Sequence, residues 1–179
     1  MKLEVAICVG ILGFCLVTTA SAQANRASQP ALISDEIIGN GEGDWGPVIE
    51  WIQRNVPSEN FDELATMNTS MAVWVDSGSL VRTGSNVKAW VHIEIFSEEG
   101  AQAAGFRSMM LLHEYRCDTR QQRQLAGASY SGTDRSGIAD EFNESRPSAW
   151  RFIRPDQIDD EILNAACNGT RIFDGTAVQ

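Results

Sequence analysis

The residue pair best suited to chemistry is His92 and Glu94, two positions apart in a stretch of alternating apolar and polar residues. On a β-strand, residues at this spacing point to the same side of the sheet, so the pair could supply two ligands to a metal ion. A structural zinc site requires four ligands and a catalytic one requires three protein ligands, and the sequence indicates no third. We therefore expect neither a metal nor another cofactor, and we interpret the pair as part of an exposed polar face.

A hydrolase is the less favoured hypothesis for the same residues. It would have to bring His92 and Glu94 together with Asp76, which ends a predicted strand beside the turn-forming sequence Ser-Gly-Ser. Aspartate at such a position commonly stabilises the turn. The other histidine, His113, lies among apolar strand residues and is expected to be a hydrogen-bonded core residue. The sequence contains no nucleophile elbow, phosphate-binding loop or dinucleotide fingerprint, so we expect no enzymatic activity.

Residues 1–22 are typical of a secretory signal peptide. Lys2 gives the segment a positive start, residues 5–17 are apolar, and residues 20–22 form a small-residue cleavage site. The apolar stretch is shorter than the roughly 20 residues that a membrane-spanning helix needs. We therefore predict an exported protein that starts at Gln23 and is not stably inserted in a membrane.

The formal net charge is −10 at pH 7, and it is unchanged after cleavage because Lys2 and Glu4 leave together. Nucleic acids and anionic membranes repel such a protein, so neither is expected as a partner. Acidic residues are concentrated at residues 35–63, while arginines are concentrated at residues 107–154. We interpret the acidic region as a solvated segment; the alternative is that it lies against the arginine-bearing surface.

Cysteine usage indicates a disulfide in the mature protein. Cys8 and Cys15 lie within the signal peptide, and Phe14 occupies the position where a lipid-attachment signal requires a small residue, so lipidation is not expected. The remaining cysteines, Cys117 and Cys167, would be in an oxidising compartment, where cysteines form disulfides. We favour a bond between them within one chain; free thiols and a bond between chains are the alternatives.

Hydrophobic alternation predicts a series of short strands followed by a helix. Residues 97–105 and 133–147 are polar and are predicted as connections. A helix is predicted at residues 156–167, because apolar residues recur at helical spacing, acidic residues fill its first turns and Gly169 lies just past its end. The fold class is therefore α+β, an antiparallel β-sheet of about six strands with a C-terminal α-helix. The predicted strands cover residues 71–75, 80–82, 87–96, 106–118, 122–131 and 149–153.

The predicted organisation has four parts. An acidic N-terminal extension follows the signal peptide, and Pro47 could start a short helix in it that ends at Arg54. A second short turn is expected at residues 59–65. The parts are the signal peptide (1–22), the extension (23–68), the sheet and helix domain (69–169) and a C-terminal tail (170–179).

One face of the predicted sheet carries more apolar surface than a monomer usually leaves in water. Either the N-terminal extension covers it, using Trp45, Trp51 and Ile52, or a second copy of the chain does, which predicts a homodimer. We treat this face as a candidate interaction surface. Its residues are Trp74, Trp90, Phe96, Met110 and Leu112.

The long polar connection at residues 133–147 is a candidate binding loop. It carries Arg135 and Arg146, whose charges could recognise a ligand. Loops on a rigid sheet are common places for recognition. The alternative is a variable loop with no binding role.

Several short motifs occur in an order that resembles the surface-adhesin protein E family of Gram-negative bacteria. They are Val-Trp-Val-Asp at 73–76, Asn-Val-Lys-Ala-Trp at 86–90, a tyrosine and Cys117 on one strand, and Trp150 ahead of the helix that ends at Cys167. The resemblance implies an antiparallel sheet tied to a C-terminal helix by a Cys117–Cys167 disulfide. The type member of the family is an outer-membrane lipoprotein that forms dimers and binds host proteins such as vitronectin, laminin and plasminogen. This chain lacks the lipid-attachment cysteine and adds the N-terminal extension.

The resemblance implies an exported, non-enzymatic binding module with unidentified protein ligands, in the periplasm or on the outer-membrane surface. The alternative is a periplasmic structural or assembly partner of an envelope complex. A small secreted hydrolase that uses His92, Glu94 and Asp76 is the third hypothesis.

Overall fold

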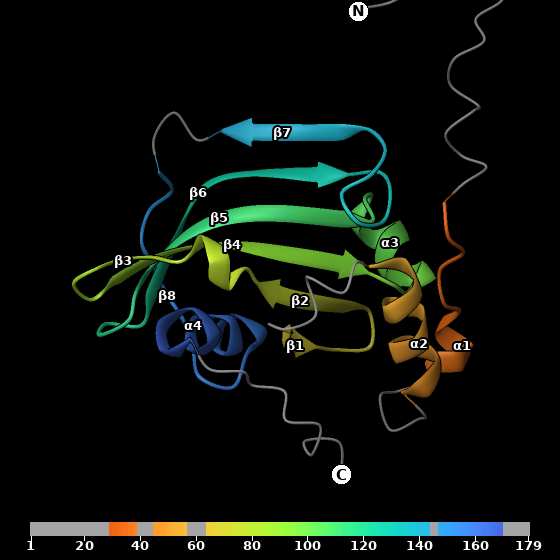
Figure 1. Ribbon diagram of the computed structural model, residues 1–179, viewed down its shortest axis with the longest axis horizontal. Helices are drawn as coiled ribbons and strands as arrows, with labels where there is room; N and C mark the ends of the chain where they lie inside the picture. Colours follow the sequence, from red (N-terminus) through yellow and green to blue (C-terminus); the bar gives the residue numbers. More distant parts are fainter. Residues whose placement is uncertain (1–28, 39–44, 57–63, 144–146, 170–179) are drawn as a thin grey trace, which may run out of the picture.

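An antiparallel sheet of eight strands forms the centre of the structure (Figure 1). The computed structural model describes residues 29–38, 45–56, 64–143 and 147–169. The strands are β1 (Leu64–Met67), β2 (Met71–Val75), β3 (Val81–Thr83), β4 (Asn86–Ile95), β5 (Ser108–Arg116), β6 (Gln121–Tyr130), β7 (Ala139–Asn143) and β8 (Arg151–Phe152). The order is β1-β2-β4-β5-β6-β7, with β3 paired to β4 beyond β2 and β8 paired to β6 beyond β7.

Four α-helices and a short 3-10 helix accompany the sheet within the described residues. They are α1 (Asp35–Ile38), α2 (Gly46–Asn55), η2 (Ser77–Ser79), α3 (Glu98–Ala104) and α4 (Ile158–Asn168). As predicted, α2 has Pro47 in its first turn and α4 ends at Gly169, whose φ of 60° is a left-handed conformation that suits glycine. In the part of the chain that is described, no helix is both long and apolar enough to cross a membrane.

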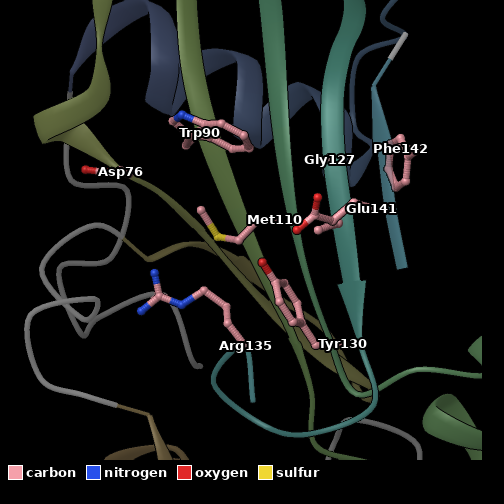
Figure 2. Close-up of a pocket in the computed structure, with 9 residues that line it drawn as sticks. Asp76, Trp90, Met110, Gly127, Tyr130, Arg135, Glu141 and Phe142 are labelled. Atoms are coloured by element: carbon pink, nitrogen blue, oxygen red, sulfur yellow. The ribbon is translucent and has the colours of Figure 1, made fainter. Parts of the chain in front are cut away.

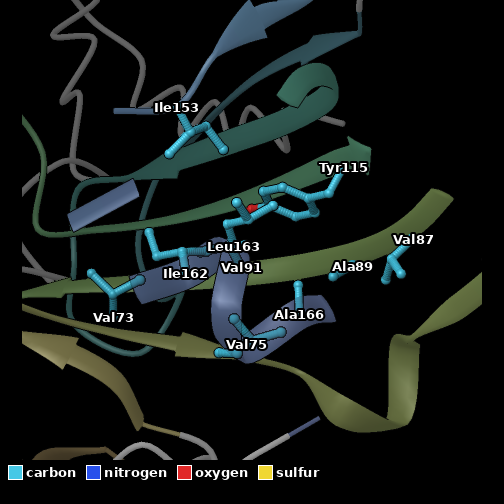
Figure 3. Close-up of a cluster of buried hydrophobic side chains, with 11 residues drawn as sticks. Val73, Val75, Val87, Ala89, Val91, Tyr115, Ile153, Ile162, Leu163 and Ala166 are labelled. Atoms are coloured by element: carbon cyan, nitrogen blue, oxygen red, sulfur yellow. The ribbon is translucent and has the colours of Figure 1, made fainter. Parts of the chain in front are cut away.

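The C-terminal helix α4 covers one face of the sheet, as predicted. Val73, Val75 and Val91, which alternate along β2 and β4, pack with Leu163 and Ala166 of α4 in one buried cluster (Figure 3). The alternation arises because every second residue of a strand points to the same face. The sequence therefore determined both the strand pattern and the face that the helix covers.

A disulfide joins Cys117, just after β5, to Cys167 near the end of α4. The Cα atoms of the two cysteines are 5.8 Å apart, and 50 positions separate them in the sequence. This confirms the predicted bond within one chain and the predicted link between helix and sheet.

The N-terminal segment covers part of the opposite face. Trp51 and Ile52 of α2 are buried in a second cluster together with Trp74 and Phe96. The indole Nε1 of Trp51 donates a hydrogen bond of 2.6 Å to the carbonyl of Ala31, which fixes the segment that precedes α1. The extension therefore covers Trp74 and Phe96, two of the five apolar residues for which the sequence predicted a cover.

The segment at residues 97–105 was predicted as a polar connection, and this prediction is wrong because it contains α3. Ser97 caps the helix, since its Oγ accepts a hydrogen bond of 2.8 Å from the Gly100 N–H. Gly105, with φ of 76°, ends the helix. Ser-Glu-Glu before alanines is a typical helix start. The helix was nevertheless not predicted, because the segment has no apolar residues at helical spacing.

Two further predictions of connecting segments require correction. The loop predicted at residues 133–147 contains the edge strand β7, which pairs with β6. Part of the turn predicted at residues 59–65 belongs to β1, which pairs with β2; the rest lies outside the described residues. Both strands are short and contain acidic or small residues, so neither shows a clear period of two.

Candidate functional site

A cleft of about 420 Å³ lies where β4, β5, β6 and β7 run side by side (Figure 2). Trp90 and Met110 reach it from β4 and β5, and the register places both on the face opposite α4 because Trp90 pairs with Leu112 and His92 pairs with Met110. Ala128 of β6 pairs with Met110 and lies on the same face. The full lining comprises Asp76, Trp90, Met110, Gly127, Ala128, Tyr130, Arg135, Glu141 and Phe142.

One wall of the cleft is fixed by the turn after β2. The Asp76 N–H donates to the Trp90 carbonyl at 3.0 Å, and the Trp90 N–H donates to Ser79 Oγ at 2.9 Å. Ser79 Oγ in turn donates to the Asp76 carbonyl at 2.7 Å. This network holds the exposed Asp76 carboxylate beside the half-buried Trp90, and it confirms Asp76 as a turn residue.

The opposite end of the cleft carries Arg135, on the loop between β6 and β7. Arg135 and its neighbour Asp134 both have positive φ, at 59° and 50°, a conformation uncommon for residues other than glycine. Hydrogen bonds hold this backbone: Ser108 Oγ donates to the Gly132 carbonyl at 2.7 Å and accepts from the Arg135 N–H at 2.9 Å. The loop therefore places Arg135 through contacts with β5.

The cleft combines an apolar floor with charges of both signs. Trp90, Met110 and Tyr130 are half-buried, whereas Asp76 and Glu141 are exposed acids and Arg135 is an exposed base. Aromatic residues, methionine and arginine are the types that protein interfaces favour. The arrangement suits a polypeptide segment that inserts an apolar side chain and pairs its own charges with those at the rim.

The structure separates the candidate interaction residues into two groups. Trp90 and Met110 line the cleft, and Leu112 is half-buried opposite Trp90 on the same face. Trp74 and Phe96 are 2 % and 0 % exposed beneath the N-terminal segment, so they are not accessible to a partner. Of the two arginines in the candidate loop, Arg135 reaches the cleft; Arg146 lies outside the described residues.

His92 and Glu94 were expected on an exposed polar face, and this expectation is wrong. Their side chains are 5 % and 0 % exposed, and His92 Nε2 lies 2.9 Å from Glu94 Oε1. The loop between β6 and β7 covers them, and the Asp134 N–H donates to Glu94 Oε1 at 2.6 Å. Burial lowers the pKa of His92 and raises the pKa of Glu94, so that it disfavours the charged form of both groups.

The three residues of the hydrolase hypothesis occupy different environments. Asp76 is exposed at the rim of the cleft, whereas His92 and Glu94 are buried beneath the loop. His113 is buried as expected, and its Nδ1 lies 3.0 Å from the hydroxyl of Tyr115. These positions do not bring a base and a nucleophile together at an accessible surface.

Sequence reasoning missed Glu141 and Phe142, which line the cleft from β7, and Tyr130, which lines it from the end of β6. Tyr130 could have been found, because it falls in a predicted strand at the same parity as Ala128. The two β7 residues could not, because the strand itself was predicted as loop.

The model of the family described as surface-adhesin protein E matches residues 61–168, more than half of the chain. No curated protein matches. A structure of Haemophilus influenzae protein E in crystal form II is 14% identical and covers 64% of this chain and 91% of that chain, with a TM-score of 0.47. A second structure of Haemophilus influenzae protein E is 13% identical and covers 64% of this chain and 87% of that chain, with a TM-score of 0.44.

Proposed function

This chain belongs to the surface-adhesin protein E family, and on that premise we propose that it is an exported, non-enzymatic module that binds protein ligands through the cleft on its sheet. The signal peptide predicted at residues 1–22 supports export. The proposed binding domain is the sheet and helix predicted at residues 69–169, to which the structure adds β1 (Leu64–Met67). The N-terminal extension acts as a structural cover for Trp74 and Phe96.

The observation that carries the proposal is the composition of the cleft. Trp90, Met110 and Tyr130 provide an apolar floor that remains half-exposed, whereas Trp74 and Phe96 on the same side of the sheet are buried beneath the N-terminal segment. Tryptophan, tyrosine and arginine dominate the binding energy of many interfaces when they line a pocket at its centre. Arg135 supplies the positive charge in a protein whose net charge is −10, so it favours a ligand segment with an acidic residue.

The test is binding of the mature chain, residues 23–179, to immobilised vitronectin, laminin and plasminogen. Trp90→Ala and Arg135→Gln should each weaken binding to whichever of these proteins is recognised, by about tenfold or more, as expected for a residue at the centre of an interface. Phe152→Ala is the matched control. Phe152 is a 57 % exposed aromatic residue on β8, which pairs with the start of β6, whereas the cleft lies near the end of β6. Unchanged binding by both cleft variants would contradict the proposed site.

Location distinguishes an adhesin from the alternative role as a periplasmic assembly partner. Protease treatment of intact cells, repeated after permeabilisation of the outer membrane, reports which side the protein faces. Cleavage on intact cells supports a surface ligand. Cleavage only after permeabilisation would contradict the surface role and direct the search to envelope partners.

A further inference from the structure

A cluster of three side chains with metal-binding atoms lies beneath the loop that carries Arg135. His92 and Glu94 come from β4, and Asp134 comes from the loop between β6 and β7. One ligand atom of each residue lies within 4.8 Å of those of the other two. We propose that His92, Glu94 and Asp134 bind one divalent transition-metal ion of the zinc or manganese class.

The distances within the cluster suit a single ion. His92 Nε2 and Glu94 Oε1 are 2.9 Å apart, and an ion about 2.1 Å from each atom would see them at about 90°. This angle fits a five- or six-coordinate ion. Three protein ligands leave positions for water, which can reach the site because the Asp134 side chain is 27% exposed.

The donor set selects the kind of ion. One imidazole and two carboxylates suit zinc, manganese or iron, whereas magnesium and calcium prefer oxygen ligands alone. The sequence supplied two of these donors, and the missing third ligand was the reason to expect no metal. The fold provides it, because Asp134 is brought over β4 from 40 positions further along the chain.

An independent observation indicates that the cluster accepts a ligand. Glu94 is fully buried, yet its Oε2 has no hydrogen-bond partner among the described residues, and the same is true of His92 Nδ1. Buried polar atoms without partners are rare, and a bound ion or water is a common explanation. An ion beside His92 Nε2 and Glu94 Oε1 would replace the contact between these two atoms, while Oε1 could still accept the Asp134 N–H that holds the loop and Oε2 could act as a second oxygen ligand of the same carboxylate.

Arg135 competes with the ion for the third ligand. Its Nη2 lies 3.5 Å from Asp134 Oδ1, so the guanidinium group provides the positive charge next to this carboxylate. An ion bound to Asp134 would have to share or displace this contact. Removal of the arginine charge should therefore strengthen metal binding, which is the opposite of its expected effect on a protein ligand.

The test uses the mature chain without a polyhistidine tag, freed of metal with a chelator and titrated with Zn²⁺ or Mn²⁺ by calorimetry. The expected result is saturable binding of one ion per chain, together with a higher midpoint of thermal unfolding. Mg²⁺ at the same concentration should have little effect. If neither Zn²⁺ nor Mn²⁺ bound at one ion per chain, the proposal would be overturned.

Variants separate a metal site from a purely structural cluster. Asp134→Asn keeps the backbone N–H that contacts Glu94, so the metal-free variant should unfold at the wild-type temperature but bind the ion at least about tenfold more weakly. Arg135→Gln should bind it several-fold more tightly. Asp140→Asn changes an exposed acid on β7 and is the matched control. Wild-type affinity in Asp134→Asn would exclude Asp134 as a ligand and overturn the site.

Discussion

The guanidinium group of Arg82, on β3, donates a hydrogen bond of 2.6 Å to the carbonyl oxygen of Cys167, at the C-terminal end of α4. The helix has no basic residue in its last turn. A cation at this end interacts favourably with the helix dipole and satisfies a carbonyl that has no partner within the helix. A residue distant in the sequence thus caps the helix beside the disulfide.

Arg82→Gln should lower the free energy of unfolding by about 1 kcal/mol, because it removes a charge-assisted hydrogen bond at a helix end. Urea unfolding followed by circular dichroism measures this change. Lys88→Gln, which removes an exposed positive charge from the neighbouring strand β4, is the control. If the two variants lowered stability equally, the loss of one positive charge would explain the effect, and the hydrogen bond to Cys167 would contribute nothing measurable.

Removal of the disulfide should cost considerably more. For two cysteines 50 positions apart, the chain-entropy model gives about 4 kcal/mol. Urea unfolding of the Cys117→Ser and Cys167→Ser double variant measures the loss, and reduced wild-type protein should show a similar decrease. A midpoint that does not change after verified reduction would mean that packing of α4 alone holds the helix on the sheet.

Stability should fall in acid because of His113. Burial is the main reason that the pKa of this imidazole is lowered to about 4, and the nearby charges of Asp159 and Arg151 have smaller, opposing effects. The unfolded chain takes up the proton near pH 6.5 and the folded protein only near pH 4, so the unfolded state binds more protons in this window. The contribution of His113 to the free energy of unfolding is therefore fully present above pH 6.5. It is lost as the pH falls toward 4, and the loss is up to about 3 kcal/mol.

Urea unfolding of wild type and His113→Gln across pH 4 to 7.5 tests this effect. The variant should be less stable than wild type at pH 7.5, since it loses the contact with Tyr115, but its stability should depend less on pH. Parallel pH profiles for the two proteins would show that His113 does not titrate in this window.

Gly127→Ala should disturb the wall of the cleft. An added Cβ would lie 2.5 Å from the Phe142 ring and 2.8 Å from the backbone carbonyl of Met110, which cannot move without a shift of β5. Overpacking of this kind costs about 1–3 kcal/mol. Thermal unfolding measures the loss, with Ser129→Ala on the same strand as control. An unchanged midpoint would contradict this expectation and show that both the Phe142 ring and the backbone of β5 shift at little cost.

The strands that pack under α4 were predictable because burial imposes a period of two on their sequence. Val87, Ala89 and Val91 alternate with polar or larger residues, and all three are fully buried. No such pattern marks α3 or β7. The first depends on a serine cap and alanines, and the second is an exposed edge strand that pairs with β6 alone in the sheet order.

The cleft and the buried cluster were predictable only in part, for a different reason. Strand parity alone places Trp90 and Met110 on one face. The approach of Asp134 to Glu94 instead depends on two consecutive left-handed residues and on the hydrogen bonds that Ser108 donates to Gly132 and accepts from Arg135. Single-sequence patterns indicate neither feature. The burial of Glu94 therefore became evident only in the folded structure.

The position of β7 at the edge of the sheet gives the two sides of the cleft unequal local stability. β4 and β5 are paired on both sides and packed against α4, so their amide hydrogens should exchange only in global unfolding. β7 has one neighbouring strand, so we expect its amide hydrogens to exchange through local opening that leaves the core intact. One side of the proposed binding cleft is thus expected to be rigid and the other adjustable, so that ligand segments of different width could be bound while the disulfide-bonded core stays intact.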